Sequence, residues 1–85
     1  MSISKEEIEQ SVINIIIDRL KIDSKEKEVT RNTKLVEDLN ADSLDATEIV
    51  MEFEEKFGCD IPEEDGEKLT TVGECIDYIA EKMGK

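Results

Sequence analysis

The chain has 85 residues, 23 of them acidic and 11 basic, so that its formal net charge is −12, and it contains no histidine. A field of that sign repels the phosphates of nucleic acids and of anionic lipids, and it attracts basic surfaces of other proteins. We therefore expect no nucleic-acid partner, no membrane insertion, and a monomer that meets basic patches on other proteins. The length suits a single domain, residues 1–85.

No apolar run exceeds three residues, as in Ile15-Ile16-Ile17, which is too short for the core of a signal peptide or a membrane span. We expect a cytoplasmic protein, with an organelle matrix, reached after loss of a targeting segment, as the alternative. Cys59 and Cys75 are the only thiols. Without histidine they do not complete a zinc site, and we predict two reduced cysteines, one in a loop and one in a helix core.

The first helix is predicted from Ser4 to Leu20. Ser4 and Glu7 have the spacing of a capping box, Ile3 and Ile8 have that of a hydrophobic staple, and apolar residues then recur at helical intervals. The next segment, residues 21–41, is mostly polar, and a connection of that length in a small domain usually signals function or disorder. Its possible anchors are Val29, Leu35, Val36 and Leu39.

The second helix is predicted from Ser43 to Phe57, with Asp42 as its cap and Gly58 just beyond its end. At about 100° per residue, one sector of this helix gathers the core positions Ala46, Ile49, Val50, Phe53 and Phe57. The opposite sector holds Leu44, Glu48, Met51 and Glu55, with Asp45, Thr47 and Glu52 at its margins.

This second sector is predicted to be exposed to solvent, yet it contains two apolar residues, Leu44 and Met51, among its carboxylates. Scattered exposed apolar residues are common, so a solvated acidic face is one interpretation. The other is a docking strip in which the two apolar side chains supply contact and the acids attract a basic partner.

A short helix started by Pro62 and weakened by Gly66 is predicted next. The last helix opens at Thr71 and Glu74, again in capping-box spacing, and stops at Gly84. No segment shows the alternation of a strand. The predicted fold is all-α, a small four-helix bundle with three main helices, one short helix and a long loop between the first two.

Ser43 lacks the neighbouring base that a catalytic nucleophile needs. No histidine is present, no G-x-S-x-G surrounds it, and Ala46 stands where S-x-x-K would need lysine. A calcium loop starting at Asp38 fails as well, because Ser43 stands where the turn requires glycine and an apolar residue replaces the bidentate glutamate. A hydroxyl at a helix N-terminus instead suits an attached phosphate, which the helix dipole favours by about 0.3–1 kcal/mol.

The stretch LNADSLD, residues 39–45, resembles the signature of acyl carrier proteins, in which the serine of Asp-Ser-Leu is the attachment point. The similarity continues almost without gaps through residues 48–83, EIVMEFEEKFGCDIPEEDGEKLTTVGECIDYIAEKM, and it spans nearly the whole chain. Two positions depart from the family pattern. Asn40 stands where glycine is frequent, although asparagine tolerates positive φ, and Gly66 stands where alanine is usual.

The resemblance implies that a phosphopantetheinyl transferase attaches 4′-phosphopantetheine from coenzyme A to Ser43, and that the thiol of this arm carries the acyl chain. It implies no catalysis and no metal. The second helix is then the recognition helix for the transferase and for the enzymes of fatty-acid synthesis. Carried over by position, recognition falls on Asp42, Leu44, Asp45, Glu48, Met51, Glu54 and Glu55, and Glu54 is the one that helical geometry alone does not select.

Family members commonly shelter the acyl chain between their helices. By alignment, the resemblance implies walls for such a pocket at Val36, Ala46, Phe53, Ile61, Leu69, Cys75 and Tyr78. Taken singly, each of these residues is more simply explained by ordinary core packing. Two alternatives to a fatty-acid carrier stay open. One is a carrier of another pathway, for polyketides or D-alanine, and the other is an acidic interaction module that works unmodified.

Overall fold

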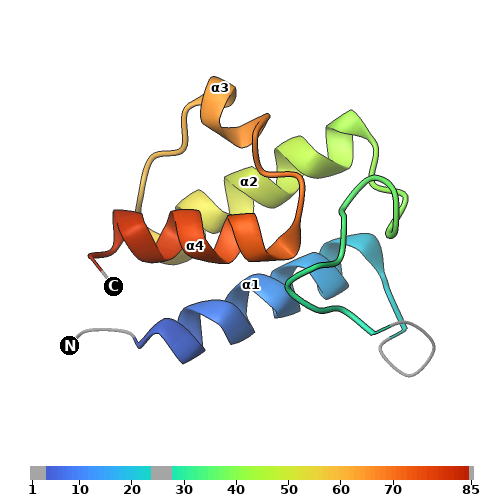
Figure 1. The fold of residues 1–85 in the computed structure, drawn as a ribbon. Coiled ribbons are helices and arrows are strands. Elements are labelled where there is room, and N and C mark those ends of the chain that lie inside the picture. Colours follow the sequence, from blue (N-terminus) through green and yellow to red (C-terminus); the bar gives the residue numbers. More distant parts are fainter. Residues whose placement is uncertain (1–3, 24–27, 85) are drawn as a thin grey trace.

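The computed structural model describes residues 4–23 and 28–84 and consists of helices joined by loops (Figure 1). The elements are α1 (Lys5–Leu20), α2 (Ser43–Phe57), α3 (Glu63–Gly66) and α4 (Val72–Lys82). The long connection between α1 and α2 passes beside the start of α4 (Figure 1). Within the described ranges the β pairing amounts to one isolated bridge, Lys34 with Thr71. The predicted all-α bundle of three main helices and one short helix is confirmed.

Local capping explains why the helices begin where the sequence predicts. The Ser4 side chain accepts a hydrogen bond from the Glu7 N–H at the start of α1, and both α2 and α4 begin with complete capping boxes. Gly58 ends α2 with φ of 64°, a left-handed conformation that glycine adopts at little cost. α4 ends at Lys82, slightly before the predicted stop. The staple residue Ile3 lies outside the described residues.

The core lies where α1 packs against α2 and α4. α1, α2 and α4 each contribute residues that share one face, the long connection adds three more, and Ile61 comes from the loop between α2 and α3. α3 contributes none of the buried residues. The ring centroids of Phe53 and Phe57, one turn apart on α2, lie 6.5 Å from each other, a distance typical of favourable aromatic pairs. The buried apolar residues are Ile8, Val12, Ile16, Leu35, Leu39, Ala41, Ile49, Phe53, Phe57, Ile61, Val72, Cys75, Ile76, Ile79 and Ala80.

Three of the predicted inward residues are less buried than expected. Val36 is 61% exposed, because its neighbours Leu35 and Leu39 take the buried positions of the connection. Ala46 and Val50 are only partly buried. They belong to the inner side of α2, as predicted, but the single turn of α3 covers them incompletely.

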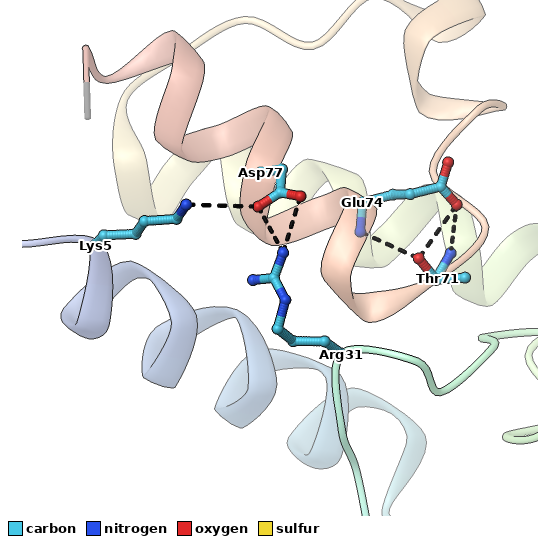
Figure 2. A network of polar contacts seen from close by, with 5 residues as sticks. All are labelled: Lys5, Arg31, Thr71, Glu74 and Asp77. Atoms are coloured by element: carbon cyan, nitrogen blue, oxygen red, sulfur yellow. Dashed lines mark hydrogen bonds and ion pairs between the residues drawn. The ribbon is translucent and has the colours of Figure 1, made fainter.

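The first turn of α4 holds the long connection in place. The Val72 N–H donates to the Thr33 carbonyl at 3.0 Å, and the Gly73 N–H donates to the Arg31 carbonyl at 2.8 Å. These N–H groups have no partner inside their own helix, so the connection satisfies them. Figure 2 shows the Arg31 side chain reaching Asp77 of α4, where it donates to both carboxylate oxygens at 2.7 and 2.9 Å.

No helix within the described residues combines the length and the apolar character that crossing a bilayer demands.

The close approach of the connection to α4 predicts a large effect of Gly73→Ala. A Cβ atom at Gly73 would lie 2.9 Å from the Arg31 carbonyl oxygen, and backbone must move to relieve it. We expect the free energy of unfolding to fall by about 1–3 kcal/mol, the usual cost of overpacking, measured by urea denaturation.

Gly66→Ala is the matched control. Its Cβ would meet the Val50 methyl groups at 3.6 and 3.8 Å, which is ordinary contact, and alanine favours the helix by up to about 1 kcal/mol. We therefore expect Gly66→Ala to leave the stability unchanged or raise it. Equal destabilisation by both variants would contradict the assignment of Gly73 as a site of close backbone contact.

Candidate functional site

Ser43 is the first residue of α2, and the turn before it fixes its position. Asn40 adopts a positive φ of 59°, which asparagine tolerates better than most residues. Ala41 is then buried, at 2% exposure, and its N–H donates to the Leu35 carbonyl at 2.9 Å. The chain therefore leaves the core at a fixed place immediately before α2.

Two aspartates hold the helix start on which Ser43 lies. The Asp45 N–H donates to the Asp42 carboxylate at 2.8 Å, and the Asp42 N–H donates to the Asp45 carboxylate at 3.4 Å. This reciprocal pair satisfies backbone donors that would otherwise have no partner. Ser43 itself is exposed. Within the described residues its hydroxyl makes no hydrogen bond, so the oxygen is available to an incoming group.

The surroundings of Ser43 suit an acceptor that an outside enzyme modifies. Asp42 and Asp45, the acidic residues at the start of the same helix, are tied to backbone N–H groups by the capping box. The positive end of the α2 dipole lies at the same place and favours an attached phosphate. Exposure, an unpaired oxygen and the dipole together fit a phosphodiester at Ser43.

A groove of about 560 Å³ begins at Ser43 and lies between α2 and the α3 segment. Its apolar lining includes Ala46, Val50 and Ile61, while Glu54, Glu63 and Glu67 are among its polar residues. Of the seven residues that the resemblance proposes as walls of an acyl pocket, Ala46 and Ile61 line this groove.

The other five proposed walls lie outside this groove. Phe53 and Cys75 are closed inside the core, at 0 and 1% exposure, whereas Leu69 and Tyr78 are partly buried and pack against that core. Val36 is exposed to solvent.

Side-chain hydrogen bonds hold α3 and the residues just before it against α2 and α4. The Tyr78 hydroxyl donates to the Asp65 carboxylate at 2.7 Å, and the Ile61 N–H donates to the Glu54 carboxylate at 3.2 Å. Glu54 thus links α2 to the segment that follows it. This contact gives Glu54 a structural role that helical periodicity did not suggest.

The outer face of α2, which we define as Leu44, Glu48, Met51 and Glu55, is where the second helix exposes its apolar residues. Leu44 is 64% exposed and Met51 is 55% exposed. All four residues line a groove of about 640 Å³ that α2 forms with α1. The exposed apolar side chains among carboxylates are present as predicted. The prediction did not include α1, which forms the other side of the groove.

Arg19 of α1 lies in that groove and pairs with two acids of α2. Its guanidinium lies 3.4 Å from the Glu48 carboxylate and also donates to the Glu52 carboxylate. Sequence reasoning missed Arg19. Its one sequence signal is a basic residue in the last turn of α1, which by itself indicates only a favourable contact with the helix dipole.

The two cysteines are poor candidates for direct acyl transfer. Burial raises the pKa of Cys75 to about 12, and burial also raises the pKa of Cys59. Both thiols are free, and the thiolate is the reactive form. Cys59 is half-buried and Cys75 is buried, so the predicted loop and core positions are confirmed. Across residues 4–23 and 28–84, no three acidic, cysteine or histidine side chains come together as a candidate metal site.

Comparison with known proteins gives the family. A family model described as "Phosphopantetheine attachment site" matches residues 10–79. An acyl carrier protein of Rubrobacter xylanophilus is 52% identical over 77 residues, which cover 91% of this chain and 93% of that protein. The chain belongs to the acyl carrier protein family.

Further relatives agree with this assignment. An acyl carrier protein of Chlamydia felis is 50% identical over 78 residues, covering 92% of this chain and 97% of that protein. One of Thermotoga maritima is 46% identical over 81 residues, covering 95% and 98%. The matched region, residues 10–79, includes Ser43 and the whole of α2, so the family resemblance of the sequence is confirmed.

The contact between α3 and α4 predicts an unusual titration of Tyr78, the only tyrosine in a chain without tryptophan. Burial, and then the hydrogen bond and the charge of Asp65, raise the pKa of Tyr78 to about 12. The folded state thus favours the neutral phenol. Its contribution to stability is complete below the unfolded pKa of about 10 and is lost as the pH rises towards 12.

Tyrosinate absorbance after a rapid pH jump measures this titration in the folded chain. Asp65→Asn removes the charge and should lower the midpoint, although burial, the largest cause, keeps it above that of the unfolded chain. Glu63→Gln, an equal loss of charge on the same helix, should leave the midpoint unchanged. A native midpoint equal to that in urea would show that Tyr78 does not hold α3.

Proposed function

We propose that this chain carries acyl groups as thioesters on a 4′-phosphopantetheine arm attached to Ser43 and presents them to enzymes of fatty-acid synthesis. The observation that carries the proposal is the position of an exposed serine, with no hydrogen bond to its hydroxyl, at the capped start of α2, inside a match to a phosphopantetheine attachment model. The arm supplies an exposed thiol, which the half-buried Cys59 and the buried Cys75 do not offer.

The attachment needs only the Ser43 oxygen from this chain. That oxygen forms a bond to the phosphorus next to pantetheine in coenzyme A, the phosphoanhydride bond breaks, and the nucleotide bisphosphate leaves with the electron pair. A base of the phosphopantetheinyl transferase takes the hydroxyl proton, because no histidine exists in this chain and both neighbouring aspartates are engaged as caps. The chain therefore acts as substrate and carrier, and the chemistry belongs to its partner enzymes.

Recognition by these enzymes is assigned to the start and the outer face of α2. Leu44 and Met51 offer exposed apolar contact, and carboxylates surround them, which complements a basic patch on a partner. The caps fix the orientation of Asp42 and Asp45 beside Ser43. A transferase that reads this pattern places its own active site over the serine.

The groove between α2 and α3 is the proposed shelter for the acyl chain. It is lined by Ser43, Ala46 and Ile61, so a chain tethered at the serine reaches apolar surface without opening the core. Burying each methylene contributes on the order of 0.8 kcal/mol. Use of the deeper walls, Phe53 and Cys75, requires a local opening of the core, because both side chains are closed to solvent here.

We further propose that the carrier works as a single-domain monomer in the cytoplasm. The net charge of −12 opposes self-association at low salt, and the groups that the proposed partners read lie on one side of one helix. Partners with basic patches, and not anionic lipid or nucleic acid, match that field.

Ser43→Ala tests the attachment. Incubation of the purified protein with coenzyme A and a phosphopantetheinyl transferase should add one phosphopantetheinyl group to the wild type and none to this variant, as seen by intact mass. The fold should survive, because Asp42 and Asp45, not Ser43, cap α2.

Ser11→Ala is the matched control, since Ser11 lies on α1 away from the capped start of α2, and it should accept the group normally. If the wild type remains bare with every transferase, or if Ser43→Ala is still modified, the proposed function is wrong. A bare chain that still binds a basic partner would indicate the unmodified interaction module.

Charge reversal tests recognition by the outer face. Glu55→Lys should slow association with the transferase by about tenfold or more at low salt, because it places a cation where a basic patch approaches. Glu81→Lys makes the same change of charge on α4 and should have a much smaller effect. Stopped-flow measurements of the association rate at several salt concentrations compare the two variants. Equal slowing by both would show that the effect comes from net charge alone.

A further inference from the structure

The acids of α2 differ in what they contact within the chain. Asp42, Asp45 and Glu54 accept hydrogen bonds from backbone N–H groups. Glu48 and Glu52 instead face a cation of the same chain, Arg19. A carboxylate bound to an N–H group keeps its full charge, whereas one paired with a guanidinium is locally neutralised.

Arg19 occupies the place where a basic partner would meet Glu48. It lines the same groove as Leu44 and Met51, and its guanidinium joins α1 to two successive turns of α2 through Glu48 and Glu52. The pairs are partly open, with side-chain exposures of 35% for Arg19 and 38% for Glu48. Water and a competing side chain can therefore reach them.

The guanidinium is not fully satisfied by these contacts. Among the described residues the Arg19 Nε atom is buried and has no hydrogen-bond partner. Arginine offers five donors in a planar fork, and the Nε–H is a buried donor that the present arrangement leaves without a partner. Displacing such a side chain breaks fewer hydrogen bonds than displacing an arginine whose donors are all bonded.

We propose that Arg19 is an internal competitor for the partner's basic residue, which lowers the attraction of the outer face and selects among partners. Partners that contact only the start of α2 are little affected, whereas partners that pair with Glu48 or Glu52 must displace Arg19. This inference rests on the proposed function, in which α2 docks onto basic enzymes. Arg19 acts as a specificity residue through Glu48 and Glu52 and takes no part in the transfer reaction.

Arg19→Gln tests the competition. With the intact protein and a phosphopantetheinyl transferase at low salt, we expect the association rate to rise about threefold, since one neutralising charge is removed from the outer face. The increase should shrink as added salt screens the face, and it should disappear in a chain that also carries Glu48→Gln and Glu52→Gln. Arg19→Lys keeps the charge and should stay close to the wild type.

Lys5→Gln is the matched control. Lys5 is the cation of an exposed α1 ion pair as well, but its partner is Asp77 of α4, at 3.8 Å (Figure 2). Lys5→Gln removes the same charge far from the outer face and should change the association rate by less than about 1.5-fold. Equal rates for Arg19→Gln and Lys5→Gln, a slower rate for Arg19→Gln, or the same increase for Arg19→Lys would each overturn the proposal.

A second measurement needs no variant. The chain holds two arginines, Arg19 and Arg31, so a nitrogen-15 spectrum of the arginine Nε–H groups contains one signal for each. Binding of the transferase should shift the Arg19 signal and leave that of Arg31, which is paired with Asp77, as an internal reference. An unchanged Arg19 signal in the complex would overturn the proposal even if Arg19→Gln failed to fold.

The two hypotheses fail in different ways. Binding rates are measured without coenzyme A, and attachment is measured separately by mass. A wild type that takes the arm, with Arg19→Gln and Lys5→Gln alike in rate, refutes the role of Arg19 and leaves the carrier function standing. A wild type that takes no arm but binds in an Arg19-dependent way refutes the carrier function and supports the competition.

Discussion

The rest of the structure depends on the way in which the first turn of α4 binds the long connection. A helix begins with N–H groups that have no partner in the helix, and here two of them, from Val72 and Gly73, are satisfied by the Thr33 and Arg31 carbonyls. The Leu35 N–H donates back to the Thr70 carbonyl at 3.0 Å, so the two segments hold each other. The part of the connection from Arg31 to Leu35 is therefore held against α4, and it delivers the chain to the start of α2 in one place.

The position of Ser43 follows from that constraint together with a local one. The connection sets where α2 begins, and the pair of Asp42 and Asp45 sets how its first turn is oriented. Neither device uses the serine hydroxyl, so the oxygen that we propose as the attachment atom does not help to hold the start of the helix. A carrier needs this separation, because a hydroxyl that held a helix end in place would destabilise the fold when it was converted to a phosphodiester.

The features that could be predicted from the sequence are those set by residues close together in the chain. The bounds of α2 follow from Asp42 at one end and Gly58 at the other, and the capping boxes follow from side chains three residues apart. Features that depend on how elements lie against each other could not be predicted. Periodicity gave the direction of Val50 but not the incomplete cover that α3 provides. The resemblance proposed Val36 as a pocket wall, although its neighbours Leu35 and Leu39 take the buried positions. The pairing of Arg19 with Glu48 and Glu52 requires the register of α1 against α2, which no local pattern contains.

The distribution of charge along α2 follows from the partner of each carboxylate. A backbone N–H fixes the orientation of an acid and leaves its charge intact, and this is the case at Asp42 and Asp45, on either side of Ser43. The single charge of the Arg19 guanidinium partly compensates Glu48 and Glu52, further along the helix. The charges of Asp42 and Asp45, beside the serine, are therefore less compensated than those of Glu48 and Glu52. Because a field of this kind steers an approaching basic surface, we infer that the unequal pairing favours an approach beside Ser43. In this proposal the contacts that stabilise the helix also influence where on it a partner docks.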